Sequence, residues 1–288
     1  MTFVIYTQFP LPSIPVALLP VCLGRFAMRS MNVFLTVFCL SVAGCGTKSE
    51  TENETAAATH SMISNSIGMQ FIAVPKGSFL INRNGVTERI QVDGPLEFGV
   101  HEVTQAQFEA VMGSNPSGFK GEKRPVENMS WEQVEDFCRK LSNLPEEKAQ
   151  GVAYRLPTED EWAYVVRAGE QVVDQFDHHA SDLGDHAWIV DNADAQTHDV
   201  GLKPSNPWGI HDMYGNVWEW CNVTESAPAK TLDDPAGHGL NQVVGTICLG
   251  GSWDSASGLC HTGVSQKARP GTKGTQFGFR VVRVSTAQ

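Results

Sequence analysis

The segment HDMYGNVWEW, residues 211–220, decides how the central part of this chain can fold. Asp212 and Glu219 supply hard carboxylate oxygens, and a turn at Gly215-Asn216 can direct backbone carbonyls inward. Such an all-oxygen environment is the one that calcium prefers. A turn packed over the two tryptophans of the same segment would show the same spacing. Both interpretations, a calcium site and a tryptophan-supported turn, remain open from the residues alone.

The surroundings of this segment contain few periodic elements. From Glu170 to Gly250 the sequence shows little of the spacing that is typical of helices or strands. A structureless stretch of that length is unusual inside a compact domain unless buried rings or a bound cation hold it in place. We therefore expect a loop-rich domain in which the 211–220 segment provides that support.

Clear helix and strand signals lie on either side of this stretch. Apolar runs broken by Pro75 and Gly77 predict short strands in MQFIAVPKGSFLIN, TERIQV and LEFGVHEV, and GFRVVRV predicts one buried strand near the end. Three helices are predicted by capping boxes, in which a hydroxyl and the side chain three residues later satisfy each other's backbone amides. These pairs are Thr104 with Gln107, Ser130 with Gln133, and Thr158 with Glu161.

Two of these helices allow more detailed predictions. In the second, Trp131, Val134, Phe137, Cys138 and Leu141 share one face, so Cys138 is interpreted as a small buried apolar residue. The third is expected to run from Glu159 to about Ala168 and to end at Gly169 in the left-handed conformation.

Composition narrows the class of protein. Hydrophobic residues make up 41% of the 288 residues, which is enough for a globular core. The net charge of −11 disfavours nucleic acid or an anionic bilayer as the main partner. Twenty-seven glycines and 15 prolines favour a loop-rich domain over a helix bundle.

The N-terminus is typical of an export signal. The text MRSMNVFLTVFCLSVAGC has a basic start, a short apolar stretch and small residues before Cys45. It resembles the lipobox of bacterial lipoproteins, in which Cys45 would become the lipidated first residue. An uncleaved membrane anchor is the alternative. We expect residues 1–44 to be a signal peptide with an N-terminal extension, and 45–62 to be a lipidated flexible tether. The protein would then be anchored in the cell envelope, facing the periplasm or the cell exterior.

Export changes the interpretation of the cysteines. Outside a reducing cytosol, Cys138, Cys221, Cys248 and Cys260 could pair in three complete ways, among which the sequence does not choose. The sequence contains no CxxC motif, which argues against a zinc ribbon. The histidines of HHASDLGDH, namely His178, His179 and His186, are interpreted as a solvated loop rather than a metal cluster.

Seven motifs resemble one family in their order. They are GMQFIAVPKGSF, HEVTQAQFEAVM, RPVENMSWEQVEDFCRKLS, YRLPTEDEWAYVVRAG, NPWGIHDMYGNVWEW, LGGSWDSASGLC and GFRVVR. In this order they are similar to the formylglycine-generating enzyme, or sulfatase-modifying factor, family. The resemblance implies one α+β domain at 63–288, C-type lectin-like and low in regular secondary structure. It also implies calcium held by Asp212, Glu219 and the carbonyls of Gly215 and Val217.

The resemblance also implies a catalytic centre, from which this sequence departs. Family members oxidise a sulfatase cysteine to formylglycine with Cu(I) held by two cysteines five residues apart. Here Ser252, Trp218 and Cys260 match the family's positions, but Ser255 stands where the first cysteine belongs. A hydroxyl is a hard, poor ligand for Cu(I), and Cys248 would replace it only if the fold brought the two sulfurs together.

Two functions follow from these observations. The first is an exported, calcium-stabilised binding or accessory module, which contacts a protein or glycan of the cell envelope and performs no oxidation. The second is a copper-dependent oxidase that converts a sulfatase cysteine or serine. The family resemblance favours the oxidase, whereas Ser255 favours the module.

Overall fold

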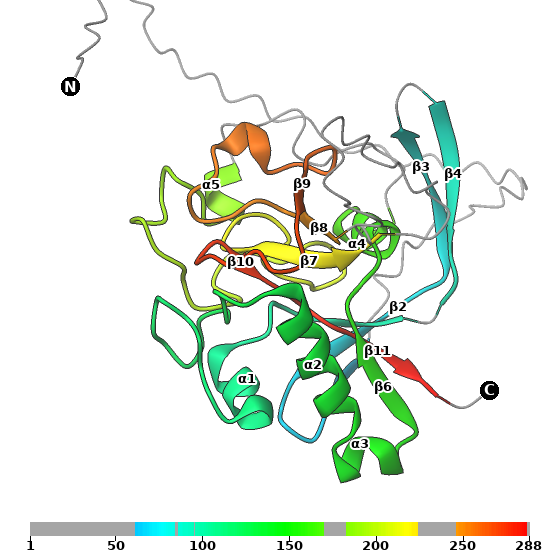
Figure 1. Ribbon diagram of the computed structural model, residues 1–288. Coiled ribbons are helices and arrows are strands. Elements are labelled where there is room, and N and C mark those ends of the chain that lie inside the picture. The colour runs from blue at the N-terminus through cyan, green and yellow to red at the C-terminus, as the bar shows by residue number, and fades with distance from the viewer. Residues whose placement is uncertain (1–60, 84–85, 95, 170–182, 224–245, 287–288) are drawn as a thin grey trace, which may run out of the picture. The chain divides into compact units, whose positions relative to one another are not determined.

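The computed structural model describes residues 61–83, 86–94, 96–169, 183–223 and 246–286 (Figure 1). Helices and strands are mixed along the chain, as the α+β prediction requires. The strands form a five-stranded, a four-stranded and a two-stranded sheet. Within these residues, every helix is too short or too polar to cross a bilayer.

The five-stranded sheet is antiparallel throughout and joins the two ends of the domain. Its order is β1 (Met62–Ser64), β2 (Gln70–Val74), β5 (Leu96–Gly99), β11 (Val282–Ser285) and β6 (Val152–Arg155). The strand nearest the C-terminus, β11, therefore lies between two strands that come much earlier in the sequence.

The four-stranded sheet contains the end of the HDMYGNVWEW segment. Its order is β10 (Phe277–Gly278), β7 (Trp218–Asn222), β8 (Thr246–Leu249) and β9 (Ser265–Ala268). Strand β10 runs parallel to β7, and the other pairs are antiparallel. Because successive side chains alternate across a strand, Trp218 and Trp220 point to one face of β7, and Glu219 and Cys221 to the other.

The two-stranded sheet is the hairpin of β3 (Gly77–Arg83) and β4 (Val86–Val92), seen at the upper right of Figure 1. Phe79 and Val92 are buried, whereas Leu80 and Val86 are exposed. These elements, with β2 and β5, confirm the strands predicted in the N-terminal half.

The helices confirm the capping-box predictions. They are α1 (Gln105–Met112), α2 (Trp131–Ser142), α3 (Pro145–Ala149), α4 (Glu159–Val166), α5 (Leu183–His186) and the 3-10 helix η1 (Ser257–Leu259). Thr104, Ser130 and Thr158 are the N-caps of α1, α2 and α4. Helix α4 ends two residues earlier than expected, and Gly169 has the predicted positive φ of 80°.

One strand prediction was right only in part, and two strands were missed. GFRVVRV was predicted as one strand, but β10 and β11 belong to different sheets. Between them the chain leaves β7 and crosses to β5, where the Gly99 amide donates to the Val281 carbonyl at 3.0 Å. Strands β7 and β8 were not predicted, because their side chains are buried on both faces and show no alternation of polar and apolar residues.

Two apolar clusters form the core. One includes Trp162, Tyr214, Cys221 and Cys260, and the other Phe137, Trp218, Cys248 and Phe279. Cys138 is 2% exposed and belongs to the second cluster, so its interpretation as a buried apolar residue is confirmed.

Candidate functional site

The predicted catalytic serines lie together in the loop that follows β8. Ser252 and Ser255 are both buried, and their hydroxyl oxygens are 3.1 Å apart. The Ser252 hydroxyl donates to Asp254 Oδ1 at 2.6 Å, and Ser255 Oγ accepts from the Ser252 amide at 3.0 Å. Ser255, which the resemblance matches to the family's first cysteine, thus has a hydroxyl oxygen that is hydrogen-bonded within the loop.

Cys260 lies against the same loop and is 1% exposed. A Cβ atom on Gly251 would be only 2.3 Å from Cys260 Sγ, so the absence of a side chain at Gly251 lets the sulfur approach the backbone. Burial raises the pKa of the Cys260 thiol to about 12, although the amides of Gly215 and Ser252 act in the opposite direction. At neutral pH the sulfur is therefore a thiol, whereas a metal-binding or nucleophilic cysteine is a thiolate.

The other sulfur and the tryptophan predicted near this centre belong to the other apolar cluster. Cys248 and Trp218 belong to the cluster that contains Phe279, whereas Cys260 belongs to the cluster that contains Trp162. Cys138, Cys221, Cys248 and Cys260 are all free and buried. The structure therefore brings Ser252, Ser255 and Cys260 together, and none of the other three described cysteines is bonded to Cys260.

A buried ion pair joins β7 to the segment between β10 and β11. Arg280 is fully buried, and its Nη2 and Nε lie 2.5 and 2.7 Å from the two carboxylate oxygens of Glu219. Trp162 Nε1 also donates to Glu219, at 2.8 Å. Burial lowers the pKa of Arg280, but the Glu219 carboxylate outweighs it and the pKa is raised, so the guanidinium stays charged.

Arg280 also organises the chain around Asp212. Its Nη1 donates to the Gly99 carbonyl at 3.2 Å, and its Nη2 to the carbonyls of His211 and Asp212 at 3.0 and 3.1 Å. One side chain thereby ties β5, the 211–212 turn and β7 together. Sequence reasoning missed Arg280. The signal was available, because a charged residue within the apolar text FGFRVV needs a buried partner.

The four residues implied as calcium ligands differ in their surroundings. Both carboxylate oxygens of Glu219 are already bound by Arg280 and Trp162. Gly215 packs directly on Trp188, since a Cβ there would be 2.2 Å from the Trp188 carbonyl oxygen. Val217 is buried. Asp212 Oδ1 is buried and has no hydrogen-bond partner among the described residues. Calcium held by all four residues stays a prediction.

A further carboxylate that sequence reasoning missed lies near Asp212. Glu102 is fully buried, and its Oε1 accepts from Asn216 Nδ2 at 3.0 Å. Burial and then the charge of Asp212 raise the pKa of Glu102 well above its usual value. Among the described residues, no three His, Cys, Asp or Glu side chains are grouped as a metal site would require.

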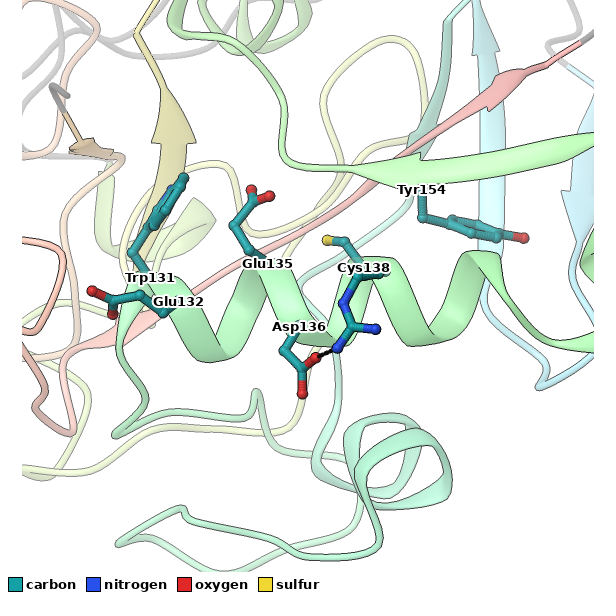
Figure 2. A pocket seen from close by; sticks show the side chains of 7 residues that line it. Trp131, Glu132, Glu135, Asp136, Cys138 and Tyr154 are labelled. Carbon is teal, nitrogen blue, oxygen red and sulfur yellow. Dashed lines mark hydrogen bonds and ion pairs between the residues drawn. The ribbon is translucent and has the colours of Figure 1, made fainter.

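A shallow pocket of about 500 Å³ lies along α2, away from these residues (Figure 2). It is lined by Trp131, Glu132, Glu135, Asp136, Cys138, Arg139 and Tyr154. Figure 2 shows Glu135 and Cys138 on the side of α2 nearer Tyr154, while Asp136 contacts Arg139 on another side. None of the predicted site residues lines it.

Several predicted residues lie outside the described part of the chain. These are Cys45, with the signal and tether, and His178 and His179 of the histidine cluster. The third histidine, His186, is the last residue of α5. The lipid anchor and the envelope location therefore stay predictions.

Comparison with known proteins identifies the class to which this fold and loop belong. Residues 57–285 match the family described as "Sulfatase-modifying factor enzyme 1-like domain". Because the match covers most of the chain, the protein belongs to this family. The structure is similar to Treponema denticola variable protein 1, with a TM-score of 0.61 at 24% identity over 78% of this chain and 98% of that one.

Individual relatives carry different names. The chain is 28% identical to the chaperone protein LppX of Paenibacillus barcinonensis, over 89% of this chain and 99% of the relative. It is 29% identical to the formylglycine-generating enzyme of Mycobacterium tuberculosis, over 46% of this chain and 52% of that enzyme. It is 28% identical to the inactive C-alpha-formylglycine-generating enzyme 2 of Bos taurus, over 46% of this chain and 47% of that protein. The chain thus spans about half the length of the two formylglycine relatives, and nearly all of LppX.

Proposed function

We propose that this protein is an exported accessory module of the sulfatase-modifying factor family, which binds another protein of the cell envelope and performs no oxidation. The observation that carries the proposal is the state of the predicted copper centre. The Ser255 hydroxyl is hydrogen-bonded to Ser252. The Cys260 thiol is buried, and its pKa is raised to about 12. One protonated sulfur and one hydroxyl make a poor site for Cu(I).

The relatives support an accessory role. LppX, whose name is that of a chaperone, matches this chain over nearly its whole length. Export and anchoring through Cys45 would place the protein where newly exported polypeptides fold. A protein client is therefore favoured over a glycan, and an exported sulfatase is the client class that the family suggests.

A single experiment separates the module from the oxidase. Purified protein is mixed with Cu(I) and oxygen and with a CxPxR peptide, and the peptide cysteine is examined by mass spectrometry for conversion to the aldehyde. We expect no conversion and no stoichiometric Cu(I) bound to Cys260. Stoichiometric Cu(I) together with aldehyde formation would establish the oxidase.

A second measurement tests the accessory role directly. A bacterial sulfatase that already carries its formylglycine is denatured. It is then refolded with and without an equimolar amount of this protein, and the two recovered activities are compared. We expect a higher yield, and the same yield for Cys260→Ala, because the role does not use the thiol. An unchanged yield with wild-type protein would contradict a sulfatase client.

Anchoring is tested on the precursor. Cys45→Ser is expected to leave the protein unlipidated and in the soluble fraction. Recovery of this variant with membranes, unchanged from wild type, would contradict the lipid anchor.

A further inference from the structure

The pocket along α2 has more negative charge in its lining than the helix itself balances. It is lined by three carboxylates, those of Glu132, Glu135 and Asp136, and by one guanidinium, that of Arg139. Arg139 lies one helical turn after Glu135, the spacing at which the two could pair, yet it contacts Asp136 instead. Lys140 Nζ also lies 3.2 Å from Asp136 Oδ2. The cations of α2 are therefore directed at Asp136 and not at Glu135.

Glu135 supplies an atom that points to a ligand. Its Oε1 is buried and has no hydrogen-bond partner among the described residues. Burial raises the pKa of Glu135, because the carboxylate loses water. A buried acceptor without a donor is unfavourable, so this oxygen requires a donor from outside the described chain.

The same side of α2 is otherwise aromatic and apolar. Trp131, Glu135 and Cys138 follow one another at helical spacing, and Figure 2 shows their side chains on one side of the helix. Trp131 Nε1 donates to Asn222 Oδ1 at 3.3 Å, which holds the indole in place. Cys138 is 2% exposed, and burial raises the pKa of its thiol, so the sulfur is uncharged. The pocket thus places one unpaired acceptor between a tryptophan and an uncharged sulfur.

These surroundings match an ammonium group on an alkyl stem. An ammonium donates to a carboxylate and is attracted to the ring of a tryptophan, while its methylene stem packs on apolar surface. A guanidinium fits less well, because its planar fork pairs best with two carboxylate oxygens and Glu135 offers one unpaired buried oxygen. The pocket is shallow and has a volume of about 500 Å³. It can therefore receive a side chain presented from outside.

We propose that this pocket binds a lysine side chain of a protein partner, with Glu135 Oε1 accepting from the ammonium group and Trp131 lying beside it. The net charge of −11 favours a basic segment as the partner. Ser252, Ser255 and Cys260 do not line the pocket, so the site is additional to the loop that follows β8. The assignment of the lysine to a protein rests on the proposed function, whereas binding of the ammonium group does not.

The test follows the indole resonance of Trp131 by NMR in the purified, ¹⁵N-labelled protein. The resonance is assigned by its loss in Trp131→Phe. Three capped tripeptides, which differ only in a central lysine, norleucine or arginine, are titrated in turn; norleucine has the stem of lysine without the ammonium group. We expect the lysine peptide to shift the resonance with a roughly millimolar dissociation constant, and the norleucine peptide to leave it unchanged.

Glu135→Gln is expected to weaken binding of the lysine peptide at least about tenfold, since an amide has no charge to attract the ammonium group. Glutamine has nearly the same shape as glutamate, so the variant is expected to fold. The control is Glu146→Gln, which removes the same charge from α3, outside the pocket, and should bind as wild type does. Equal binding by wild type and Glu135→Gln would overturn the proposal.

Three other results would also overturn it. Equal shifts with the lysine and norleucine peptides would mean that the pocket binds only the apolar stem. Tighter binding of the arginine peptide would mean that a guanidinium is the ligand. If no peptide shifts the resonance and Glu135→Gln is more stable than wild type, Glu135 is a protonated acid without a ligand.

Butylammonium distinguishes the two sources of an ammonium group. Binding weaker than that of the lysine peptide would support a protein partner, because the peptide backbone then adds contacts. Binding as tight as that of the peptide would overturn the protein partner in favour of a free amine. The proposed function fails separately: if the lysine peptide binds but the protein does not raise the refolding yield of the sulfatase, the pocket stands and only the sulfatase client is lost.

Discussion

Arg280 contacts both carboxylate oxygens of Glu219 in a fully buried pair, and the same guanidinium reaches the carbonyls of Gly99, His211 and Asp212. The pair joins the segment before β11 to β7 and fixes the 211–212 turn. Removing one partner of a buried pair leaves the other charge uncompensated, which is far more destabilising than losing a surface pair.

Arg280→Ala is therefore expected to lower the free energy of unfolding by about 3–5 kcal/mol, measured by urea denaturation. Arg139→Ala is the control, because Arg139 is exposed and contacts Asp136 on the surface of α2; its effect should stay below about 0.5 kcal/mol. The double variant Arg280→Met with Glu219→Leu should recover most of the loss. A loss for Arg280→Ala as small as that of the control would show that the pair contributes little.

Gly251→Ala should destabilise the loop around Cys260. Gly251 has a φ of 85°, and an added Cβ would lie 2.3 Å from Cys260 Sγ. The left-handed backbone alone costs roughly 1–3 kcal/mol for a residue with a side chain, and the clash adds to it. Gly258→Ala, where a Cβ meets nothing within 4 Å, is the control and should change stability by less than about 0.5 kcal/mol. Thermal denaturation of the two variants side by side checks this; similar midpoints would contradict the close packing of Cys260.

The Cys260 thiol should resist alkylation. With a pKa raised to about 12, only roughly one molecule in ten thousand is a thiolate at pH 8. Iodoacetamide at pH 8 is expected to leave Cys260 unmodified in the folded protein and to modify it fully in urea, as read by peptide mapping. Rapid modification of the folded protein would mean that the sulfur is accessible and ionised. That result would support the copper-dependent oxidase as the function.

Ser255→Cys is expected to increase Cu(I) affinity at least tenfold, because it supplies the soft ligand that the family has at this position. Competition with a chromophoric Cu(I) chelator measures the affinity. Ser257→Cys, two residues along the same loop, is the control that adds a thiol at a position where the family has none. If wild-type protein already competes as well as Ser255→Cys, Ser255 does not explain a missing oxidase activity.

The carboxylate of Glu147 should make the free energy of unfolding depend on pH. Burial raises the pKa of Glu147, but hydrogen bonds from Ser66 and Tyr154 outweigh it, so the folded-state pKa is lowered. Its contribution is therefore present above the unfolded-state pKa, about 4.3, and is lost as the pH falls through the folded-state pKa. Glu147→Gln should cost about 1–3 kcal/mol at pH 7, and less at pH 3.

Urea denaturation at both pH values measures the difference between Glu147→Gln and wild type. The exposed neighbour Glu146 provides the control Glu146→Gln, which should show no such difference. A cost of Glu147→Gln that is the same at pH 7 and pH 3 would show that the charge on Glu147 does not contribute.

Local signals in the sequence predicted local structure. The capping residues Thr104 and Thr158 marked the first residues of α1 and α4, because a cap needs only neighbours within one turn. The apolar stripe of α2 likewise located a buried face that includes Cys138. What failed depended on distant partners. GFRVVRV is divided because the chain passes from one sheet to another within it. A run of apolar residues does not show which strand will pair with it.

The candidate site was predictable in its residues but not in their arrangement. Ser252, Ser255 and Cys260 were named from the sequence and lie together. Glu219 was expected to bind calcium, which stays a prediction, whereas its contact with the guanidinium of a residue 61 positions away was not expected. Glu102 was not singled out, and Asn216 was named only as a turn residue, because the hydrogen bond between their side chains joins positions 114 residues apart.

The position of β11 has a consequence for how the polypeptide is made. The five-stranded sheet is complete only when residues 282–285 insert between β5 and β6. A nascent chain that lacks residues 282–285 holds β5 and β6 without the strand that pairs with both. The five-stranded sheet can therefore form as a whole only after residues 282–285 have been delivered, and a truncation before residue 282 would remove the strand that joins β5 to β6.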